Sequence, residues 1–226
     1  MRIGFLSDIH GNVEALDVAL AALQALRPER LYCLGDIVGY GANPNECIEK
    51  VRQTCQAVVL GNHDAALIGH TGIQYFNSYA QEAIVWTSKV ITEENLAFLR
   101  GIPLALSLHG LLMVHATPRD PAHWDYIFSA REARRHFEVM EEPMAFIGHS
   151  HIPAEFSDEK TGRRIINIGS VGQPRDGDPR LCCGLFDSEI GTFQCIREVY
   201  PVQDAAARIR RAGLPEFLAQ RLLLGM

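Results

Sequence analysis

The chain has 226 residues and a formal net charge of −6, with 47% hydrophobic and 21% charged residues. This composition fits a soluble globular protein with an ample core. It argues against a general nucleic-acid binder, because phosphate-backbone affinity comes from clustered lysine and arginine. No apolar run approaches the ~18 residues of a membrane span, and Asp8 interrupts the N-terminal run too early for a secretory leader. The six cysteines form no CxxC pair, so we expect reduced thiols in a cytoplasmic protein.

The first sixty residues alternate between predicted strands and helices. Apolar positions at steps of three and four predict a helix over 13–26, which Pro28 ends. A second helix begins at Pro44 and runs to about Thr54. The apolar runs around these helices predict strands at 2–7, 31–34 and 57–60. Such alternation predicts parallel strands with right-handed crossovers, whose carboxyl ends share one edge of the sheet, where ligands bind in these folds.

The second half is predicted to be richer in strands. Before it lies a helical insert at about 75–100, with a new helix start near Thr92. A further helix is expected at about 129–139, and C-terminal helices at about 203–224. The strands expected in this half are 104–108, 111–114, 144–147, 154–157, 163–168, 181–187 and 192–199. Because no repeat or linker separates these segments, we predict a single domain over 1–226, with two packed sheets flanked by helices.

Five polar motifs directly follow short apolar runs. They are Asp8-Ile9-His10, Gly35-Asp36, Gly61-Asn62-His63-Asp64, Val114-His115 and Gly148-His149-Ser150-His151. The first three fall at the predicted edge of the parallel sheet. If the backbone there is extended, His149 and His151 point to the same side, which suits one metal bound by both imidazoles or two adjacent metals with one each. Taken alone, this last motif is equally compatible with ordinary core or surface histidines.

The residue types indicate a metal centre. Aspartate, asparagine and histidine without cysteine suit Mn, Fe, Zn or Co. Two aspartates, one amide and four histidines exceed the needs of one tetrahedral ion and suit two ions that share a carboxylate, for which Asp36 is the natural bridge. With a bridging hydroxide the site would stay about one unit positive and attract an anion. Paired ions ~3.5–4 Å apart generate hydroxide at neutral pH and hold the oxygens of an in-line displacement at phosphorus. The residues therefore predict hydrolysis of a phosphate ester.

In this order, the motifs D-x-H, G-D, G-N-H-D, H and G-H-S-H resemble those of the calcineurin-like metallophosphoesterases, over residues 2 to about 178. The resemblance implies an α/β fold built as a four-layer α-β-β-α sandwich with two mixed sheets. It implies one metal on Asp8, His10, Asp36 and His151, and another on Asp36, Asn62, His115 and His149. His63 would lie beside the scissile bond, where it protonates the leaving oxygen or binds the phosphoryl group. Asp64 would orient His63 or the local backbone, or simply begin a helix.

One departure concerns the second motif, which continues to Gly39 and Tyr40. In the protein-phosphatase branch of the family these places hold an aspartate that supports the catalytic histidine and an arginine that binds phosphate. Without that arginine, a phosphomonoester dianion is a weaker candidate substrate. The chain is more similar to the small bacterial phosphodiesterase branch. Tyr40 is a candidate for packing on a substrate base or sugar, with a structural aromatic as the alternative.

Two loops supply further candidate substrate contacts. Arg119 follows the fourth motif, and Arg175 lies in a glycine-rich loop after the last histidines. Both are candidate phosphate ligands, with a loop-bracing ion pair to the following aspartate as the alternative. His123 is a candidate for the substrate entrance.

Together these observations predict a dinuclear metal-dependent phosphodiesterase that hydrolyses small or nucleotide phosphodiesters. A metal-bridging hydroxide would attack in line, with His63 assisting the leaving group. Mn²⁺ is the first expected metal, with Fe, Zn, Ni or Co as alternatives. The alternative functions are a phosphomonoesterase or protein phosphatase, and a non-catalytic metal-binding scaffold of the same fold. The expected partner is a small phosphate ester or nucleotide, and we expect neither stable nucleic-acid binding nor membrane binding. The apolar stripes of the helices are compatible with a homo-oligomer.

Overall fold

The computed structural model describes residues 1–226 and contains two five-stranded sheets. The first sheet has the order β10-β9-β1-β2-β3. Its strands are β1 (Arg2–Leu6), β2 (Arg30–Cys33), β3 (Ala57–Val58), β9 (Leu181–Asp187) and β10 (Thr192–Glu198). β1, β2 and β3 are parallel to one another, whereas β9 and β10 join in antiparallel fashion. The predicted strand–helix alternation of the first sixty residues is therefore confirmed.

The second sheet has the order β4-β5-β6-β8-β7. Its strands are β4 (Ala105–Leu108), β5 (Leu111–Val114), β6 (Met144–Ile147), β7 (Ala154–Ser157) and β8 (Arg164–Asn167). β5, β6 and β8 run parallel in the centre, and antiparallel edge strands flank them. Both sheets are thus mixed, as predicted.

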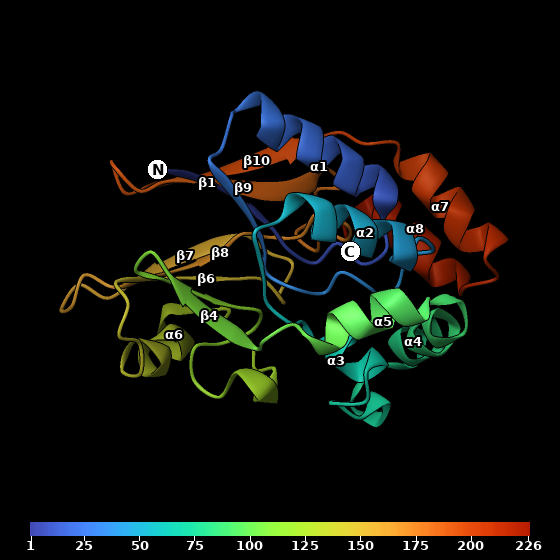
Figure 1. Ribbon diagram of the computed structural model, residues 1–226, viewed down its shortest axis with the longest axis horizontal. Helices are drawn as coiled ribbons and strands as arrows, with labels where there is room; N and C mark the ends of the chain where they lie inside the picture. Colours follow the sequence, from blue (N-terminus) through green and yellow to red (C-terminus); the bar gives the residue numbers. More distant parts are fainter.

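Helices cover the outer faces of the two sheets (Figure 1). The α-helices are α1 (Val13–Ala25), α2 (Pro44–Thr54), α3 (Asn62–Leu67), α4 (Ser78–Val90), α5 (Glu93–Arg100), α6 (Ala130–Phe137), α7 (Val202–Arg211) and α8 (Glu216–Leu224), and two short 3₁₀ turns lie at Ile73–Tyr75 and Pro121–His123. α1 packs on β9 and β10 of the first sheet, and α6 packs on β7 and β8 of the second. No helix is both long and apolar enough to cross a bilayer.

Three apolar clusters separate these layers. The first lies between the helices around α1 and one face of the first sheet, and the third lies between α6 and the second sheet. The middle cluster joins the two sheets, where Phe5 of β1 stacks on Phe146 of β6 with ring centroids 4.1 Å apart. Alternation along β1 explains the arrangement, since Ile3 and Phe5 face the other sheet while Leu6 belongs to the helix side. The four-layer α-β-β-α sandwich is confirmed.

Two local features differ from the sequence prediction. β3 was expected to extend to residue 60 but pairs only at Ala57 and Val58. Beyond them Leu60 donates its N–H to the carbonyl of Pro103, outside the sheet. The sequence indicated the short helix α3 only through the alternative helix-start role of Asp64, because six residues are too few to show helical periodicity. Its formation places Asn62 and His63 on a helix start.

Candidate active site

The candidate metal ligands converge from both sheets. Asp8 and Asp36 follow β1 and β2, while His115 and His149 follow β5 and β6. Because these strands are parallel within their sheets, their carboxyl ends bring the motifs to a common edge. The seven candidates, Asp8, His10, Asp36, Asn62, His115, His149 and His151, are all buried, and none exposes more than 8% of its surface. The structure therefore gathers side chains that lie up to 143 positions apart in the sequence.

Five of these residues have a left-handed backbone. Positive φ angles of 50° to 68° occur at Asp8, His10, Asp36, His149 and His151. Non-glycine residues adopt this region rarely and at a cost of about 1–3 kcal/mol each, and such residues concentrate at functional sites. The backbone at His149 and His151 is not extended, because each residue occupies a bend, so the condition under which both would point to one side is not met. The bends instead direct them to different groups of ligands.

The backbone fixes the orientation of four imidazole rings. Nδ1 of His10 lies 3.0 Å from the carbonyl oxygen of Val38, and Nδ1 of His115 lies 2.7 Å from that of Leu34. Likewise, Nδ1 of His151 lies 2.5 Å from the carbonyl oxygen of Gln173, and Nε2 of His149 lies 2.9 Å from that of Trp124. A carbonyl oxygen only accepts, so in each ring this nitrogen carries the hydrogen. The other nitrogen of each ring faces the site, where it offers a lone pair to a metal once it carries no proton, which is the usual arrangement of metal-binding histidines.

The first group consists of Asp8, His10 and His151. The Nε2 atoms of His10 and His151 face each other at 3.1 Å, and Nε2 of His151 lies 3.2 Å from Oδ1 of Asp8. Oδ1 of Asp8 is buried and has no hydrogen-bond donor. Two lone pairs and an unpartnered carboxylate oxygen repel one another in a buried site unless a cation lies between them. The residues therefore fit a divalent metal.

The second group consists of Asp36, His115 and His149. Oδ2 of Asp36 lies 3.4 Å from Nε2 of His115 and 3.6 Å from Nε2 of His10, so this oxygen stands between the two groups. The amide oxygen of Asn62 lies 3.1 Å from Nε2 of His115. This donor set, one carboxylate oxygen plus imidazoles and an amide, fits a second divalent cation.

The pKa values of the buried histidines reflect competing forces. Burial lowers the pKa of His10 well below its usual range, lowers that of His151, and lowers that of His149 to about 3. His115 differs, because the charges of Asp36 and Asp8 outweigh its burial and raise its pKa to about 9. The three lowered rings are neutral at pH 7 and suited to metal binding. His115 holds a proton whenever the two carboxylates lack another cation.

His63 begins the first turn of α3 beside these groups. Its Nδ1 is buried without a hydrogen-bond partner and lies against Gly39, where an added Cβ would be only 2.4 Å away. Gly39 also has a φ of +94°, which favours glycine. Burial lowers the pKa of His63 to about 4, although Asp36 acts in the opposite direction. His63 is therefore neutral at pH 7.

Asp64 does not contact the His63 ring. Its carboxylate instead accepts hydrogen bonds from the backbone N–H groups of Ile37, Val38 and Gly61, at 3.0 to 3.3 Å. Burial and the charge of Asp36 raise the pKa of Asp64 to about 7 against the effect of these donors. Of the roles considered from the sequence, the geometry fits two, since Asp64 orients the backbone at Ile37 and Val38 and also accepts from the N–H of Gly61 at the start of α3. It links the two loops that carry Asp36 and Asn62.

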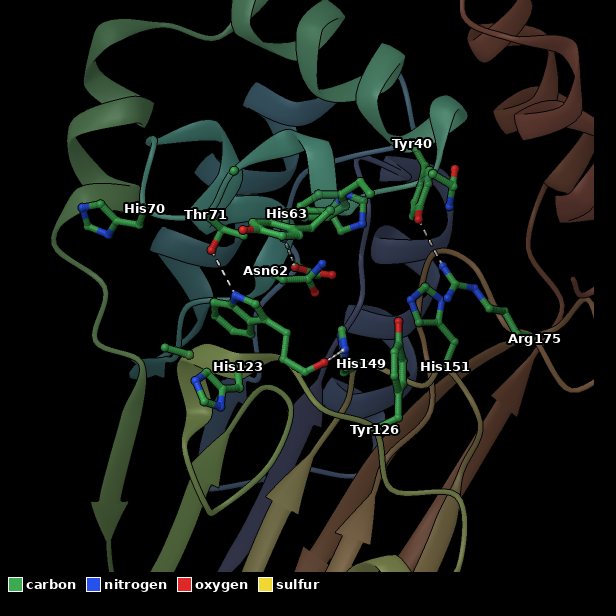
Figure 2. Close-up of a pocket in the computed structure, with 17 residues that line it drawn as sticks. Tyr40, Asn62, His63, His70, Thr71, His123, Tyr126, His149, His151 and Arg175 are labelled. Carbon is green, nitrogen blue, oxygen red and sulfur yellow. Dashed lines mark hydrogen bonds between the residues drawn. The ribbon is translucent and has the colours of Figure 1, made fainter.

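A cavity of about 590 Å³ opens in front of the candidate ligands. Asp36, Asn62, His63, His149 and His151 form part of its wall (Figure 2). This volume is ample for a small ligand, for which pockets of about 300–1,000 Å³ are usual.

Aromatic and basic side chains form much of the remaining wall. Arg175 donates to the hydroxyl of Tyr40 at 3.5 Å (Figure 2). It also donates to the side-chain oxygen of Gln173 at 2.9 Å. Its guanidinium also lies 5.7 Å from the centroid of the Tyr40 ring, and that of Arg221 lies 5.6 Å from the same centroid. Asp176, the alternative partner of Arg175, pairs with Arg197 instead. Arg175 is thus the arginine of the cavity wall.

Trp124 connects two other residues of the cavity wall, Thr71 and His149. Its indole N–H donates to Oγ1 of Thr71 at 3.0 Å, and its carbonyl oxygen accepts from His149 (Figure 2). Tyr126 stacks on the His149 ring with centroids 4.1 Å apart. Sequence reasoning missed both aromatic residues as well as Arg221. The His-Trp-Asp-Tyr sequence at 123–126 was a signal for the first two, but nothing near Arg221 in the sequence pointed to the site.

The two remaining candidates have different positions. His123 lines the cavity, at the edge formed by the 3₁₀ turn Pro121–His123. Arg119 is absent from the cavity wall, and its Nε lies 3.9 Å from the carboxylate of Asp120 with both side chains largely exposed. Arg119 is therefore placed in the loop-bracing arrangement and not beside the candidate ligands.

Comparison with known proteins agrees with this geometry. The calcineurin-like phosphoesterase superfamily domain matches residues 1–190. An uncharacterized protein of Methanocaldococcus jannaschii is 38% identical, and the match covers 99% of this chain and 98% of that protein. The crystal structure of a metallophosphoesterase from Sphaerobacter thermophilus is similar with a TM-score of 0.91 and 38% identity, over 100% of this chain and 99% of the other. The structure of a hypothetical protein from Pyrococcus horikoshii has a TM-score of 0.87 at 23% identity, over 100% and 98% of the two chains.

Proposed function

The chain belongs to the calcineurin-like phosphoesterase superfamily, and we propose that within it the protein is a dinuclear metal phosphodiesterase acting on small or nucleotide phosphodiesters. The observation that carries the proposal is the pair of buried ligand groups, between which Oδ2 of Asp36 stands close to both His10 and His115. Four imidazoles fixed by backbone carbonyls face carboxylates in these groups. Such an arrangement is costly for a fold to maintain without cations.

Asp8, His10, Asp36 and His151 would hold one cation, and Asp36, Asn62, His115 and His149 would hold the other. A pair of divalent cations supplies Lewis-acid stabilisation of the phosphoryl oxygens and activates water at neutral pH. We take Mn²⁺ as the first metal to test, followed by Fe, Zn, Ni and Co.

His63 is the side chain proposed to act directly on the substrate. Being neutral, it donates one hydrogen bond, to a phosphoryl oxygen or to the leaving oxygen. Its Nδ1 faces Gly39 and no carboxylate, so no acidic partner stabilises an imidazolium through that nitrogen. This arrangement suits hydrogen bonding to the substrate better than delivery of a full proton to a poor leaving group.

The cavity wall supports a diester over a monoester. Arg175 is its arginine, and its hydrogen bonds already go to Tyr40 and Gln173. A phosphomonoester dianion is best bound by a free guanidinium fork, whereas a diester carries a single negative charge. Tyr40, Phe76, Trp124 and Tyr126 provide apolar and aromatic surface for the group esterified to phosphate. Such a wall accommodates a nucleoside or another flat substituent.

The test compares turnover of bis(p-nitrophenyl) phosphate with that of p-nitrophenyl phosphate in protein reconstituted with Mn²⁺. We expect a higher kcat/KM for the diester. Preference for the monoester would instead identify a phosphomonoesterase, and metal binding without turnover of either ester or of cyclic nucleotides would identify a scaffold. Elemental analysis of freshly purified protein gives the metal stoichiometry, for which we expect two ions per chain.

A variant separates the role of His63 from metal binding. His63→Ala should lower kcat for the diester by about 10²–10³-fold, as the removal of one hydrogen-bond donor to the developing charge does, while both cations remain bound. His109→Ala is the matched control, because His109 is exposed in the turn between β4 and β5 and should leave kcat unchanged. Unchanged turnover in His63→Ala would refute the assigned role.

A further inference from the structure

Two cysteines meet on the first sheet, away from the candidate active site. In the antiparallel pair β9–β10, Cys182 is opposite Arg197 and Cys195 is opposite Gly184. Residues two apart on a strand share a face, so the two cysteines are diagonal neighbours on the same face. Their sulfur atoms lie 2.9 Å apart, and both are free thiols. Adjacent strands therefore hold the two sulfurs close enough to react with each other.

The two thiols differ in exposure and environment. Cys195 is exposed on β10, which is the edge strand of the sheet, whereas Cys182 is buried and its Sγ lies 3.1 Å from the carbonyl oxygen of Ile168. The guanidinium of Arg197 lies beside the pair and hydrogen bonds to the carboxylate of Asp176. A hydrogen bond from Cys182, helped by Arg197 and opposed by partial burial, lowers the pKa of Cys195 to about 7. An accessible thiol with a lowered pKa beside a buried partner is typical of an attacking and a resolving cysteine.

We propose that Cys182 and Cys195 form a reversible dithiol–disulfide site that is oxidised by hydroperoxides. The thiolate of Cys195 attacks one peroxide oxygen, the O–O bond breaks, and the departing oxygen takes up a proton, so that Cys195 becomes a sulfenic acid. The thiol of Cys182 then attacks the sulfenic sulfur, forming the S–S bond and releasing water. Two thiols thereby lose two electrons and two protons to one peroxide. A small dithiol reverses the reaction by exchange.

The remaining cysteines make useful controls. Cys183 follows Cys182 but points to the opposite face of β9, and Cys33 and Cys47 are buried in the interior. Cys55 is the next most accessible thiol, at the end of α2, and no other cysteine sulfur is hydrogen bonded to it. Neither Cys182 nor Cys195 lines the cavity, so the proposal does not depend on the proposed function.

The experiment treats the reduced, full-length protein with hydrogen peroxide after removal of reductant. Two free thiols per chain should disappear, and non-reducing peptide mapping should recover one peptide that joins Cys182 to Cys195. Dithiothreitol should restore both thiols. The oxidised protein should melt at a higher temperature than the reduced one, because the new bond restricts the unfolded chain. Absence of the 182–195 peptide, or its appearance only between different chains, would overturn the proposal.

Variants assign the two roles. Cys195→Ser should abolish cross-linking, and since its side chain is exposed, the variant should fold. Cys182→Ser should leave Cys195 as a sulfenic acid that dimedone labels, and Cys55→Ser should cross-link as the wild type does. Cross-linking that persists in Cys195→Ser, or is lost in Cys55→Ser, would contradict the assignment. The peptide map of the unmutated protein decides the question if Cys182→Ser does not fold.

Discussion

Gly148→Ala adds one carbon beside a candidate ligand without removing any ligand atom. An ideal Cβ on Gly148 would lie 2.0 Å from Oγ of Ser7 and 2.4 Å from Oδ2 of Asp8. Ser7 donates to this oxygen at 2.6 Å, and the backbone N–H of His149 donates to it at 3.0 Å. The substitution therefore presses on the side chain that completes the first ligand group.

The magnitude follows from these distances. To reach even the 3.0 Å below which Cβ contacts essentially do not occur, Oγ of Ser7 must retreat by about 1 Å and Oδ2 of Asp8 by about 0.6 Å. Overpacking of this kind costs about 1–3 kcal/mol, which lowers the melting temperature of a chain of this length by about 2–12 °C. A misplacement of about 1 Å at a reacting centre lowers turnover by about 10²-fold, so the smaller shift of Asp8 should lower turnover by about 10-fold or more, up to that limit.

The assay combines melting temperature, metal content and turnover of bis(p-nitrophenyl) phosphate. Gly101→Ala is the matched control, since its φ is −88° and the nearest atom to an added Cβ, the carbonyl oxygen of Phe98, lies at 3.5 Å. We expect the control to match the wild type in all three measurements. If folded Gly148→Ala kept full metal content and turnover, the position of Asp8 would be irrelevant to the chemistry and the reasoning would fail.

Three further predictions concern the surroundings of the site. In metal-free protein His115 is protonated below about pH 9 because Asp36 is unneutralised, so calorimetric titration with Mn²⁺ should release about one proton more at pH 7.5 than at pH 10. The protonated form of His115 also stabilises the metal-free fold, and this stabilisation is complete below pH 6.5 and absent above about pH 9. A proton release that does not change with pH would contradict both statements. At pH 5, below its raised pKa of about 7, Asp64 is neutral in the fold, so Asp64→Asn changes no charge there; it should lower the free energy of unfolding in urea by about 1–3 kcal/mol, because the amide nitrogen cannot accept from a backbone donor. Turnover per bound metal should hold, and its loss at unchanged stability would refute a backbone-bracing role. Trp124→Phe and Thr71→Val should each cost about 0.5–1.5 kcal/mol, and the double variant no more than either one, since both remove the same hydrogen bond; additive losses would disprove the link.

Most of the fold follows from sequence pattern. The helix expected over 13–26 is α1, and the strands expected at 144–147, 154–157 and 181–187 have these bounds in the structure. Long periodic stretches and apolar runs bounded by glycine or proline are what such reasoning detects well. α3 spans only six residues, and its start depends on Asp64 accepting from the N–H of Gly61, a contact that periodicity does not reveal.

Within the site, the sequence predicts those residues whose own side-chain chemistry indicates a function. The candidate ligands are polar residues that directly follow apolar strands, and this signal is local. Trp124 orients the His149 ring by accepting a hydrogen bond at its backbone carbonyl oxygen. Every residue type has this carbonyl, so the identity of residue 124 does not predict the contact. Arg221 reaches Tyr40 from α8, across the packing of α8 against the first sheet's helices. Such contacts depend on how separate elements pack against one another, so no short segment of the sequence predicts them.

The division of the candidate ligands between the two sheets has a consequence for assembly. Asp8, His10, Asp36 and Asn62 come from the first hundred residues, and the three remaining histidines come from the second sheet. Neither half of the molecule can therefore complete a coordination sphere by itself. Each cation of the proposed pair would have ligands from both halves and would hold them together. If the chain were severed in the exposed turn before β4, at Pro103 or Leu104, manganese would be expected to promote reassociation of the two fragments.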